Sequence, residues 1–267
     1  MNKEEELLAK RFQELSRLAE LKCMTTFSDF LNLNEQNILH QTLQKFPWIH
    51  CKASGGYEGA ERQIAAFVPD ALSYLIEDKT EDKNSGFDLP SLSYPISCIR
   101  TEPLNRKFAE PLSHRDILGA LMHLGIERSK MGDIAVCEDQ FYVFCHESMA
   151  SLICSELTRI RHTSVRCTIS ETDDFIYTPK TKEITGTVAS VRLDALMAVA
   201  FQSSRSSLLS LISDGKVFIN GKLITTNAYT PKDGDLISAR GEGKFRFITA
   251  SGQTKKGRCL VKIEKYI

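Results

Sequence analysis

Four basic side chains in the last third of the sequence stand where they could bind phosphate groups. Arg192 and Arg205 each lie at the expected start of a helix, and Lys216 and Lys222 flank the short apolar segment VFI that follows. The first turn of a helix has unpaired backbone N–H groups, and these act together with cationic side chains on anions. The spacing predicts a groove lined by cations and N–H groups, which suits the backbone of a nucleic acid.

The charges are unevenly distributed along the chain. It has 267 residues with 34 Lys and Arg against 34 Asp and Glu. Residues 187–267 contain thirteen basic and six acidic residues, a net charge of +7, so the rest carries −7. Because clustered cations attract a phosphate backbone and release its counterions, this favours a polyanion-binding module on an acidic body. A basic surface that is only solvated is the alternative.

Composition excludes several classes of protein. At about 150 residues per domain, the length suggests two or more domains. The apolar stretches are shorter than the roughly 18 residues that a membrane span needs, and the charged amino terminus is not a secretory signal, so we expect a cytoplasmic protein. The eight cysteines form no C-x2-4-C pair, so we expect reduced thiols, no metal site and no cofactor.

Residues 1–76 read as an α+β unit. Apolar residues at helical spacing predict a first helix near Lys3 to Lys22. A second helix is expected after Asn34, which could cap it, and it should stop at Pro47. A short strand over residues 48–53 and a helix in AERQIAAFV would complete the unit.

A regular pattern follows the polar stretch 77–95, which we expect to be a linker or long loop. Residues 96–172 predict the order βαββαβ, with helices over 113–124 and 147–160. This is the order of the ferredoxin-like fold and of the RNA-recognition motif. The fold class expected for the whole chain is therefore α+β with several domains.

The aromatic residues of one strand in this region have two interpretations. Phe141, Tyr142 and Phe144 could stack on bases or could pack in the core beneath the helices. We favour the core, because the strand lacks the full Gly-Phe-rich signature of an RNA-recognition motif.

A connector is expected over residues 173–186, followed by a third unit over 187–267. Two helices with apolar faces lead to Asp214-Gly215, which should end the second helix. The strand 217–219 then runs into Asn220-Gly221, a dipeptide favoured in tight turns between antiparallel strands.

The order R-L-D-x-x-L, S-R-x-x-L-x-x-L-I-x-x-G-x-V-x-I-N-G-K and G-D-x-I resembles the alpha-L RNA-binding domain of the S-four type over about fifty residues. The resemblance implies eight positions that contact RNA or shape the contact surface. They are Arg192, Ser204, Arg205, Ser206, Lys216, Asn220, Gly221 and Lys222. The tail adds cations near glycines that allow a close approach of backbone to phosphate, namely Lys255, Lys256 and Arg258. A solvated hairpin tip is the alternative for this tail.

Further segments extend the resemblance over most of the chain. GGYEGAER, PLSHRDILGALMHLGIERSKMGDI and the terminal TKKGR are similar to the bacterial YlmH family of RNA-binding proteins. That resemblance implies a ferredoxin-like central domain before a carboxy-terminal alpha-L domain. It also implies rRNA, tRNA and the large ribosomal subunit as partners, a role in rescuing stalled ribosomes, and a link to cell division. We expect a monomer with no membrane partner.

The central region offers a second candidate RNA surface in its basic loops. Ser113 could cap the helix there. The candidate residues are Arg106, Lys107, Arg115, Arg128 and Lys130. Surface pairing and helix capping are the alternative roles for them.

Enzymatic readings fit the sequence less well. R-L-D around Asp194 superficially resembles the catalytic aspartate motif of pseudouridine synthases, but it lies in the binding domain itself and no catalytic domain follows. Residues 55–59 lack the G-x-G-x-x-G order that an rRNA methyltransferase would need. We therefore expect no catalytic residues, with an RNA-modifying enzyme and a protein scaffold in cell division as the alternatives.

Overall fold

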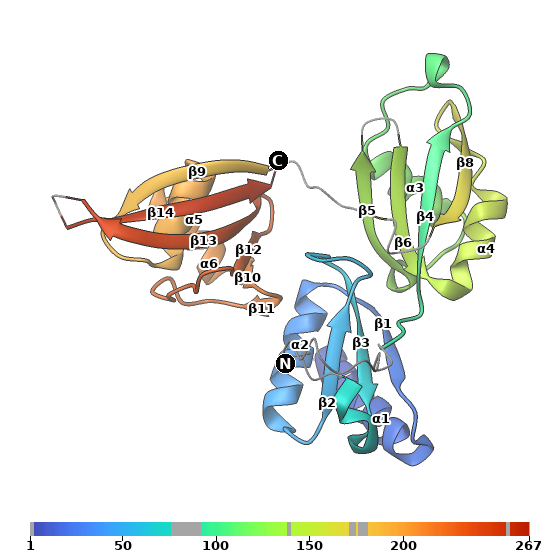
Figure 1. Cartoon of the computed structure of the whole chain (residues 1–267), viewed down its shortest axis with the longest axis horizontal. Coiled ribbons are helices and arrows are strands. Elements are labelled where there is room, and N and C mark those ends of the chain that lie inside the picture. Colours follow the sequence, from blue (N-terminus) through green and yellow to red (C-terminus); the bar gives the residue numbers. More distant parts are fainter. Residues whose placement is uncertain are drawn as a thin grey trace, which may run out of the picture. The chain divides into compact units, whose positions relative to one another are not determined.

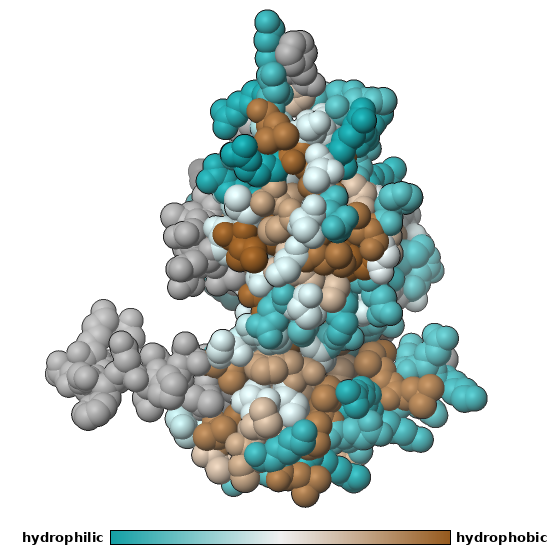
Figure 2. Space-filling model, turned by 90° about the vertical axis from the view of Figure 1, so that its right-hand side faces the viewer, coloured by the Kyte–Doolittle hydropathy of each residue, from teal (hydrophilic) through white to brown (hydrophobic). Residues whose placement is uncertain are grey.

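The computed structural model describes residues 3–75, 92–137, 140–170, 175, 181–254 and 257–266. It divides into two compact units, Met1–Tyr177 and Thr178–Ile267 (Figure 1). Figure 2 shows hydrophobic and hydrophilic residues interspersed over one face of the molecule.

The first unit begins with a small subdomain of two helices on a three-stranded sheet. Its elements are α1 (Lys3–Lys22), β1 (Thr26–Leu31), α2 (Leu33–Lys45), β2 (His50–Ser54), β3 (Gln63–Val68) and the 3-10 helix η1 (Asp70–Leu75). The strands are antiparallel in the order β1-β3-β2. The rings of Phe12 and Phe67 stack with centroids 5.8 Å apart in the core between α1 and the sheet.

Two expectations for this subdomain are wrong. Residues 63–68 form the central strand β3 and not a helix. Five consecutive side chains from Ile64 to Val68 are buried there, so the run lacks the alternation that marks a half-exposed strand. The cap of α2 is Asn32 and not Asn34: its Oδ1 accepts hydrogen bonds from the backbone N–H groups of Asn34 and Glu35, and Glu35 Oε2 accepts one from the Asn32 N–H.

The second part of this unit, which we call the central domain, covers Ile96 to Ser170. It contains β4 (Ile96–Pro103), η2 (Arg106–Phe108), α3 (His114–His123), η3 (Arg128–Lys130), β5 (Met131–Cys137), β6 (Gln140–His146), α4 (Glu147–Glu156), β7 (Arg159–Ile160) and β8 (Thr163–Ser170). The sheet order is β5-β6-β4-β8-β7 with every pair antiparallel. The helix expected over 147–160 ends at Glu156, because the chain turns there into the β7–β8 hairpin.

The two faces of the central sheet are covered differently. Helices α3 and α4 cover one face, where Ile117 and Ile153 pack against Ile99 and Val143. On the other face, Phe144 is fully buried against Tyr57 and Phe175. Phe141 is buried on the helical face. Phe141 and Phe144 therefore belong to the core, and Tyr142 is half-buried with its ring 4.6 Å from that of Phe175.

A buried arginine joins the small subdomain to the central domain. Arg62 donates hydrogen bonds to the carbonyl oxygens of Met131 (Nε, 2.7 Å), Phe30 (Nη2, 3.0 Å) and Arg128 (Nη2, 3.0 Å). The carboxylate of Asp133 accepts bonds from the Tyr57 hydroxyl and from the Glu61 and Arg62 backbone N–H groups. Burial lowers the pKa of Arg62, and nearby carboxylates oppose that shift.

The second unit is a six-stranded sheet with two helices. It contains β9 (Thr181–Val188), α5 (Leu193–Phe201), α6 (Arg205–Ser213), β10 (Val217–Ile219), β11 (Lys222–Leu223), β12 (Leu236–Ala239), β13 (Gly243–Gln253) and β14 (Cys259–Tyr266). The antiparallel order is β11-β10-β12-β13-β14-β9. Leu196, Met197 and Leu208 of the helices pack on Ile237 and Phe245 of the sheet.

The connector expected over 173–186 is shorter than the sequence indicated. Residues 181–188 form β9, which pairs with β14 along its full length. Its alternating exposure is typical of an edge strand with one covered face, which the polar sequence TKEITGTV concealed. Of that expected connector, residues 173–174 and 176–180 lie outside the described part, as do residues 77–91 of the expected linker.

Candidate nucleic-acid interface

Arg192 is held at the start of α5 by a buried carboxylate. Its Nε lies 3.2 Å from Asp194 Oδ1, and the Asp194 side chain is only 7% exposed while that of Arg192 is 41% exposed. The backbone N–H of Leu193 donates to the Tyr229 carbonyl and anchors the helix end. Arg192 is thus a half-exposed cation with one fixed partner.

The start of α6 is built from serines. Ser204 is the N-cap, and its Oγ accepts a hydrogen bond from the Ser207 backbone N–H. The Oγ atoms of Ser204 and Ser206 lie 3.0 Å apart, and both residues are exposed. Arg205 is the first residue of the helix, and its side chain lies outside the described part of the structure. The N-terminus of α6 therefore presents two exposed serine hydroxyl groups.

The turn between β10 and β11 has the geometry that its Asn-Gly sequence predicts. Asn220 and Gly221 have φ values of +48° and +77°, the left-handed conformations of a type I′ turn. Asn220 Oδ1 accepts from the Leu236 N–H at 2.9 Å, and its Nδ2 donates to Asp235 Oδ1 at 2.8 Å. These bonds fix the turn from which the exposed Lys222 projects.

The structure places Arg240 beside Lys216, at the end of β10 away from the turn, a position that the sequence analysis missed. Its backbone N–H donates to the Lys216 carbonyl at 2.9 Å, and its guanidinium lies 5.2 Å from the Phe218 ring centroid. The Lys216 Nζ is 3.1 Å from Asp214 Oδ2, and its side chain is half-exposed. The pairing of β10 with β12 brings these cations together. The basic, glycine-rich segment ARGEGK could have indicated Arg240.

Of the tail candidates, Arg258 lies in the part of the chain that the structure describes. Lys255 and Lys256 are outside the described residues. Arg258 Nη2 donates to the Thr187 carbonyl at 2.7 Å, which ties the start of β14 to the end of β9. Strands β14 and β9 lie at the opposite edge of the sheet from β10 and β11. Arg258 is therefore separate from the β10–β11 hairpin.

The five basic candidates of the central domain do not form one cluster. Arg128 and Lys130 precede Met131, which the strand pairing places level with Ser97 near the start of β4. Arg106 and Lys107 follow the opposite end of β4. Arg106, Lys107 and Arg115 are exposed.

Arg128 and Lys130 contact other parts of the protein. Arg128 Nη1 donates to the Met131 and Gly132 carbonyls, and burial together with nearby Arg62 lowers the pKa of Arg128. Lys130 Nζ pairs with Asp29. Both side chains therefore have partners within the protein, which is the alternative to RNA contact that the sequence left open.

A recess of about 220 Å³ lies beside η2 at the end of the central sheet. Its lining comes from the end of β4, the loop before α3, and the adjoining ends of β5 and β6, and it includes Pro103, Arg106, Glu110, Val136, Gln140 and Phe141. The exposed Arg106 is part of this lining, and Lys107 follows it in the chain.

Cysteines and other potential metal ligands are scattered among the described residues of the fold. Within the described ranges, no group of three or more His, Cys, Asp or Glu side chains could hold a metal ion. Burial raises the pKa values of Cys51, Cys98 and Cys145 to about 12, so these thiols stay protonated at neutral pH. No helix that the structure describes is long and apolar enough to cross a membrane.

Comparison with known proteins matches both regions. Residues 96–174 match the family described as "Putative RNA-binding domain in YlmH", and residues 191–237 match the S4 domain. A Bacillus subtilis (strain 168) protein, "Ribosome-associated protein quality control protein P2", is 28% identical over 264 residues, 98% of this chain and 96% of that protein. The solved structure "Cell division protein ylmH from Streptococcus pneumoniae" matches 66% of this chain and 97% of that chain, with 21% identity and a TM-score of 0.49. The recess lies within the first matched region, and the β10–β11 hairpin with Lys222 lies within the second.

Proposed function

We propose that this chain, which belongs to the YlmH family of bacterial RNA-binding proteins and has a C-terminal S4 domain, binds structured RNA on the ribosome and catalyses no reaction. The observation that carries the proposal is the β10–β11 hairpin. Lys222 follows the turn that Asn220 fixes at one end of β10, within the residues that match the S4 domain. Lys216 and Arg240 lie next to each other at the other end of this three-residue strand. Cations carried by a rigid backbone suit the binding of phosphates.

The S4 domain supplies the main contact to rRNA or tRNA. The start of α6 adds the Ser204 and Ser206 hydroxyls and backbone N–H groups that suit a phosphate. The net charge of +7 over residues 187–267 supports the same role. Arg192, Arg205 and Lys222 are the residues for which we propose direct contact, and Asn220 and Gly221 shape the turn.

The central domain is proposed to be ferredoxin-like and to make a second contact. Its β4-α3-β5-β6-α4-β8 order and the core strand order β5-β6-β4-β8 support that fold. Arg106, Lys107 and Arg115 are the exposed cations available to RNA.

We place the function in the cytoplasm, on the large ribosomal subunit, in the quality control of stalled translation. The name of the Bacillus relative supports ribosome association and quality control. Contact with the tRNA that carries a stalled peptide, a monomeric state and a link to cell division are further parts of the proposal.

Cosedimentation with purified ribosomal subunits tests this function. We expect the full chain to pellet with the large subunit at low salt, and the Arg205→Ala/Lys222→Ala double variant to remain in the supernatant. Lys22→Ala/Lys45→Ala removes two exposed lysines of the first unit and serves as the control that still binds. Equal binding of both double variants would contradict the role of the S4 domain.

The alternatives give different results in related assays. A scaffold in cell division would capture a protein partner that survives nuclease treatment. An RNA-modifying enzyme would isomerise or methylate nucleosides in RNA incubated with the protein, and we expect those nucleosides to be unchanged.

A further inference from the structure

The recess of the central domain has the dimensions of a site for one ring system. Its volume of about 220 Å³ lies below the roughly 300 to 1,000 Å³ of pockets that enclose drug-sized ligands. Pro103, Val136 and Phe141 supply apolar walls, and Val136 is 47% exposed, so its side chain is accessible from the solvent. A flat ligand with apolar faces fits such walls.

The polar groups of the recess are complementary to the edge of a nucleobase. Glu110 and Arg106 of the lining carry a carboxylate and a guanidinium. A carboxylate accepts hydrogen bonds from ring or exocyclic N–H groups, and a guanidinium donates to ring nitrogens and carbonyls. The edge of a nucleobase carries both kinds of partner.

The Gln140 amide is held on the other face of the sheet. Arg100 Nε donates to its Oε1 at 3.0 Å, and its Nε2 lies 3.0 Å from the Tyr142 hydroxyl. Tyr142 packs with Phe144 on the face away from the helices, whereas Phe141 of the recess lies on the helical face. Because side chains alternate along a strand, we assign the polar groups of the recess to Arg106 and Glu110.

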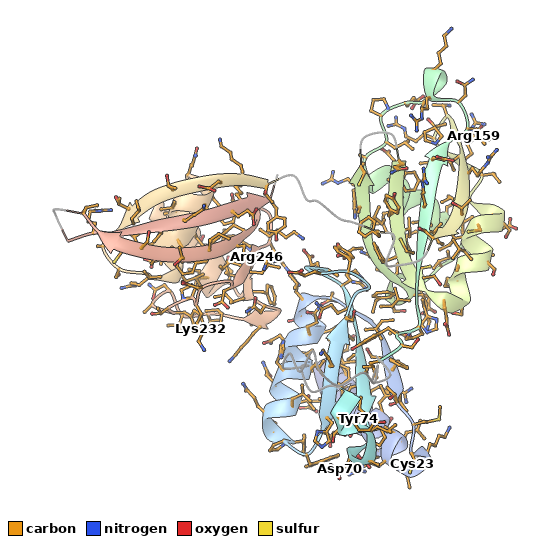
Figure 3. The ribbon with its side chains drawn as sticks, viewed as in Figure 1. Cys23, Asp70, Tyr74, Arg159, Lys232 and Arg246 are labelled. Carbon is orange, nitrogen blue, oxygen red and sulfur yellow. The ribbon has the colours of Figure 1, made fainter. Side chains whose placement is uncertain are left out.

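The surrounding charges favour RNA, with its base and not its phosphate inside the recess. Lys107 follows Arg106 in η2, and the β7–β8 hairpin at the same end of the sheet carries Arg159, which Figure 3 labels. Arg161 of this hairpin pairs with Glu110 at 3.9 Å and with Asp116 at 3.5 Å, and its side chain is 55% exposed. These exposed cations suit a phosphate backbone that passes outside. Glu110 in the lining repels a phosphate but accepts a hydrogen bond from a base.

From these observations we propose that the recess receives one unstacked nucleobase of a single-stranded RNA segment, with the cations of η2 and the β7–β8 hairpin on its flanking phosphates. This rests on the proposed RNA-binding function and assigns it a second site, independent of the S4 hairpin. Single-stranded segments are where RNA offers unstacked bases to proteins.

Filling the recess tests the proposal in the full chain. Val136→Trp places an indole in it without removing a charge. Ile169→Trp is the matched control, because Ile169 is 59% exposed on β8 of the same sheet and does not line the recess. Equal thermal stability of the two variants establishes that both fold.

The probe is a fluorescently labelled single-stranded RNA of about ten nucleotides, followed by anisotropy. Losing a base contact of about 1–3 kcal/mol corresponds to an affinity about five- to 150-fold weaker, so we expect Val136→Trp to weaken binding by that factor. Ile169→Trp should change the affinity by less than about twofold. Abasic substitution in the RNA should weaken binding to the wild type and have little further effect on Val136→Trp.

Two results separate this proposal from the general function. Equal binding by Val136→Trp and Ile169→Trp, or no binding of the probe by the wild type, would overturn the base site. Ribosome association that persists in either case would leave the S4-based function standing, whereas loss of all RNA and ribosome binding in the wild type would remove both.

Discussion

The clearest stability prediction concerns Arg62, which joins the small subdomain to the central domain. Its side chain donates three hydrogen bonds to carbonyl oxygens of Met131, Phe30 and Arg128, and the residue is only 9% exposed. Arg62→Met keeps most of the apolar stem and removes the guanidinium. Three carbonyls would then each lose a donor, and that of Met131 would keep its bond from Arg128 Nη1.

The expected loss is large relative to the stability of a domain. A hydrogen bond to a charged group contributes about 1.5–3 kcal/mol, and removing one partner from a buried ionic network costs about 3–5 kcal/mol. Because the three bonds share one side chain and relaxation admits water, we expect about 3–5 kcal/mol and not the sum of three bonds. Typical domains have only about 5–15 kcal/mol to lose.

Urea unfolding followed by circular dichroism measures this loss. Arg11→Met is the control for the same substitution, because the Arg11–Glu14 pair has side chains that are 63% and 65% exposed and such pairs contribute about 0–1 kcal/mol. A loss below about 1 kcal/mol in Arg62→Met would refute the reasoning, since it would mean that the buried carbonyls find other donors.

Three further outcomes follow from local geometry. Asn220→Ala should destabilise the second unit by about 2–3 kcal/mol in thermal unfolding. Alanine tolerates the left-handed φ of this turn less well than asparagine does, and the change removes two side-chain hydrogen bonds. Unchanged stability would contradict the fixed turn. At pH 8 a thiol of pKa about 12 is ionised to only about one part in ten thousand, so Cys145 should resist alkylation in the folded protein while the exposed Cys23 reacts, as peptide mass mapping would show. Hydrogen bonds from Ser113 lower the pKa of Asp116, so Ser113→Ala should raise that pKa toward its ordinary value in an NMR titration. Because the folded-state pKa is lowered, the stabilisation from this carboxylate is present above its unfolded pKa and disappears as the pH falls through the folded value.

Local signals in the sequence predicted some elements correctly. Helices with periodic apolar residues and clear caps, such as α3 after Ser113, were recognised because their pattern and their capping groups are close in sequence. The Asn220-Gly221 turn was recognised because few residue pairs accept its left-handed conformation.

Elements defined by distant contacts were predicted poorly. Strand β3 lies between two strands and is buried on both faces, so its apolar run did not distinguish a strand from a helix. The role of Arg62 depends on carbonyls up to 69 residues away, and Arg240 joins Lys216 only through strand pairing. Such roles follow from tertiary structure, which spacing along the chain does not encode.

The measurement that tests the central claim most directly is the salt dependence of RNA binding. If about five phosphates are neutralised, the affinity of the full chain for ribosomal RNA should fall with a log-log slope near −3.5, about a hundredfold between 50 and 200 mM salt. Lys216→Ala/Lys222→Ala should make the slope shallower by about 1.4, while Lys22→Ala/Lys45→Ala should leave it unchanged. A slope near zero, or the same slope in both double variants, would contradict phosphate binding by the S4 hairpin.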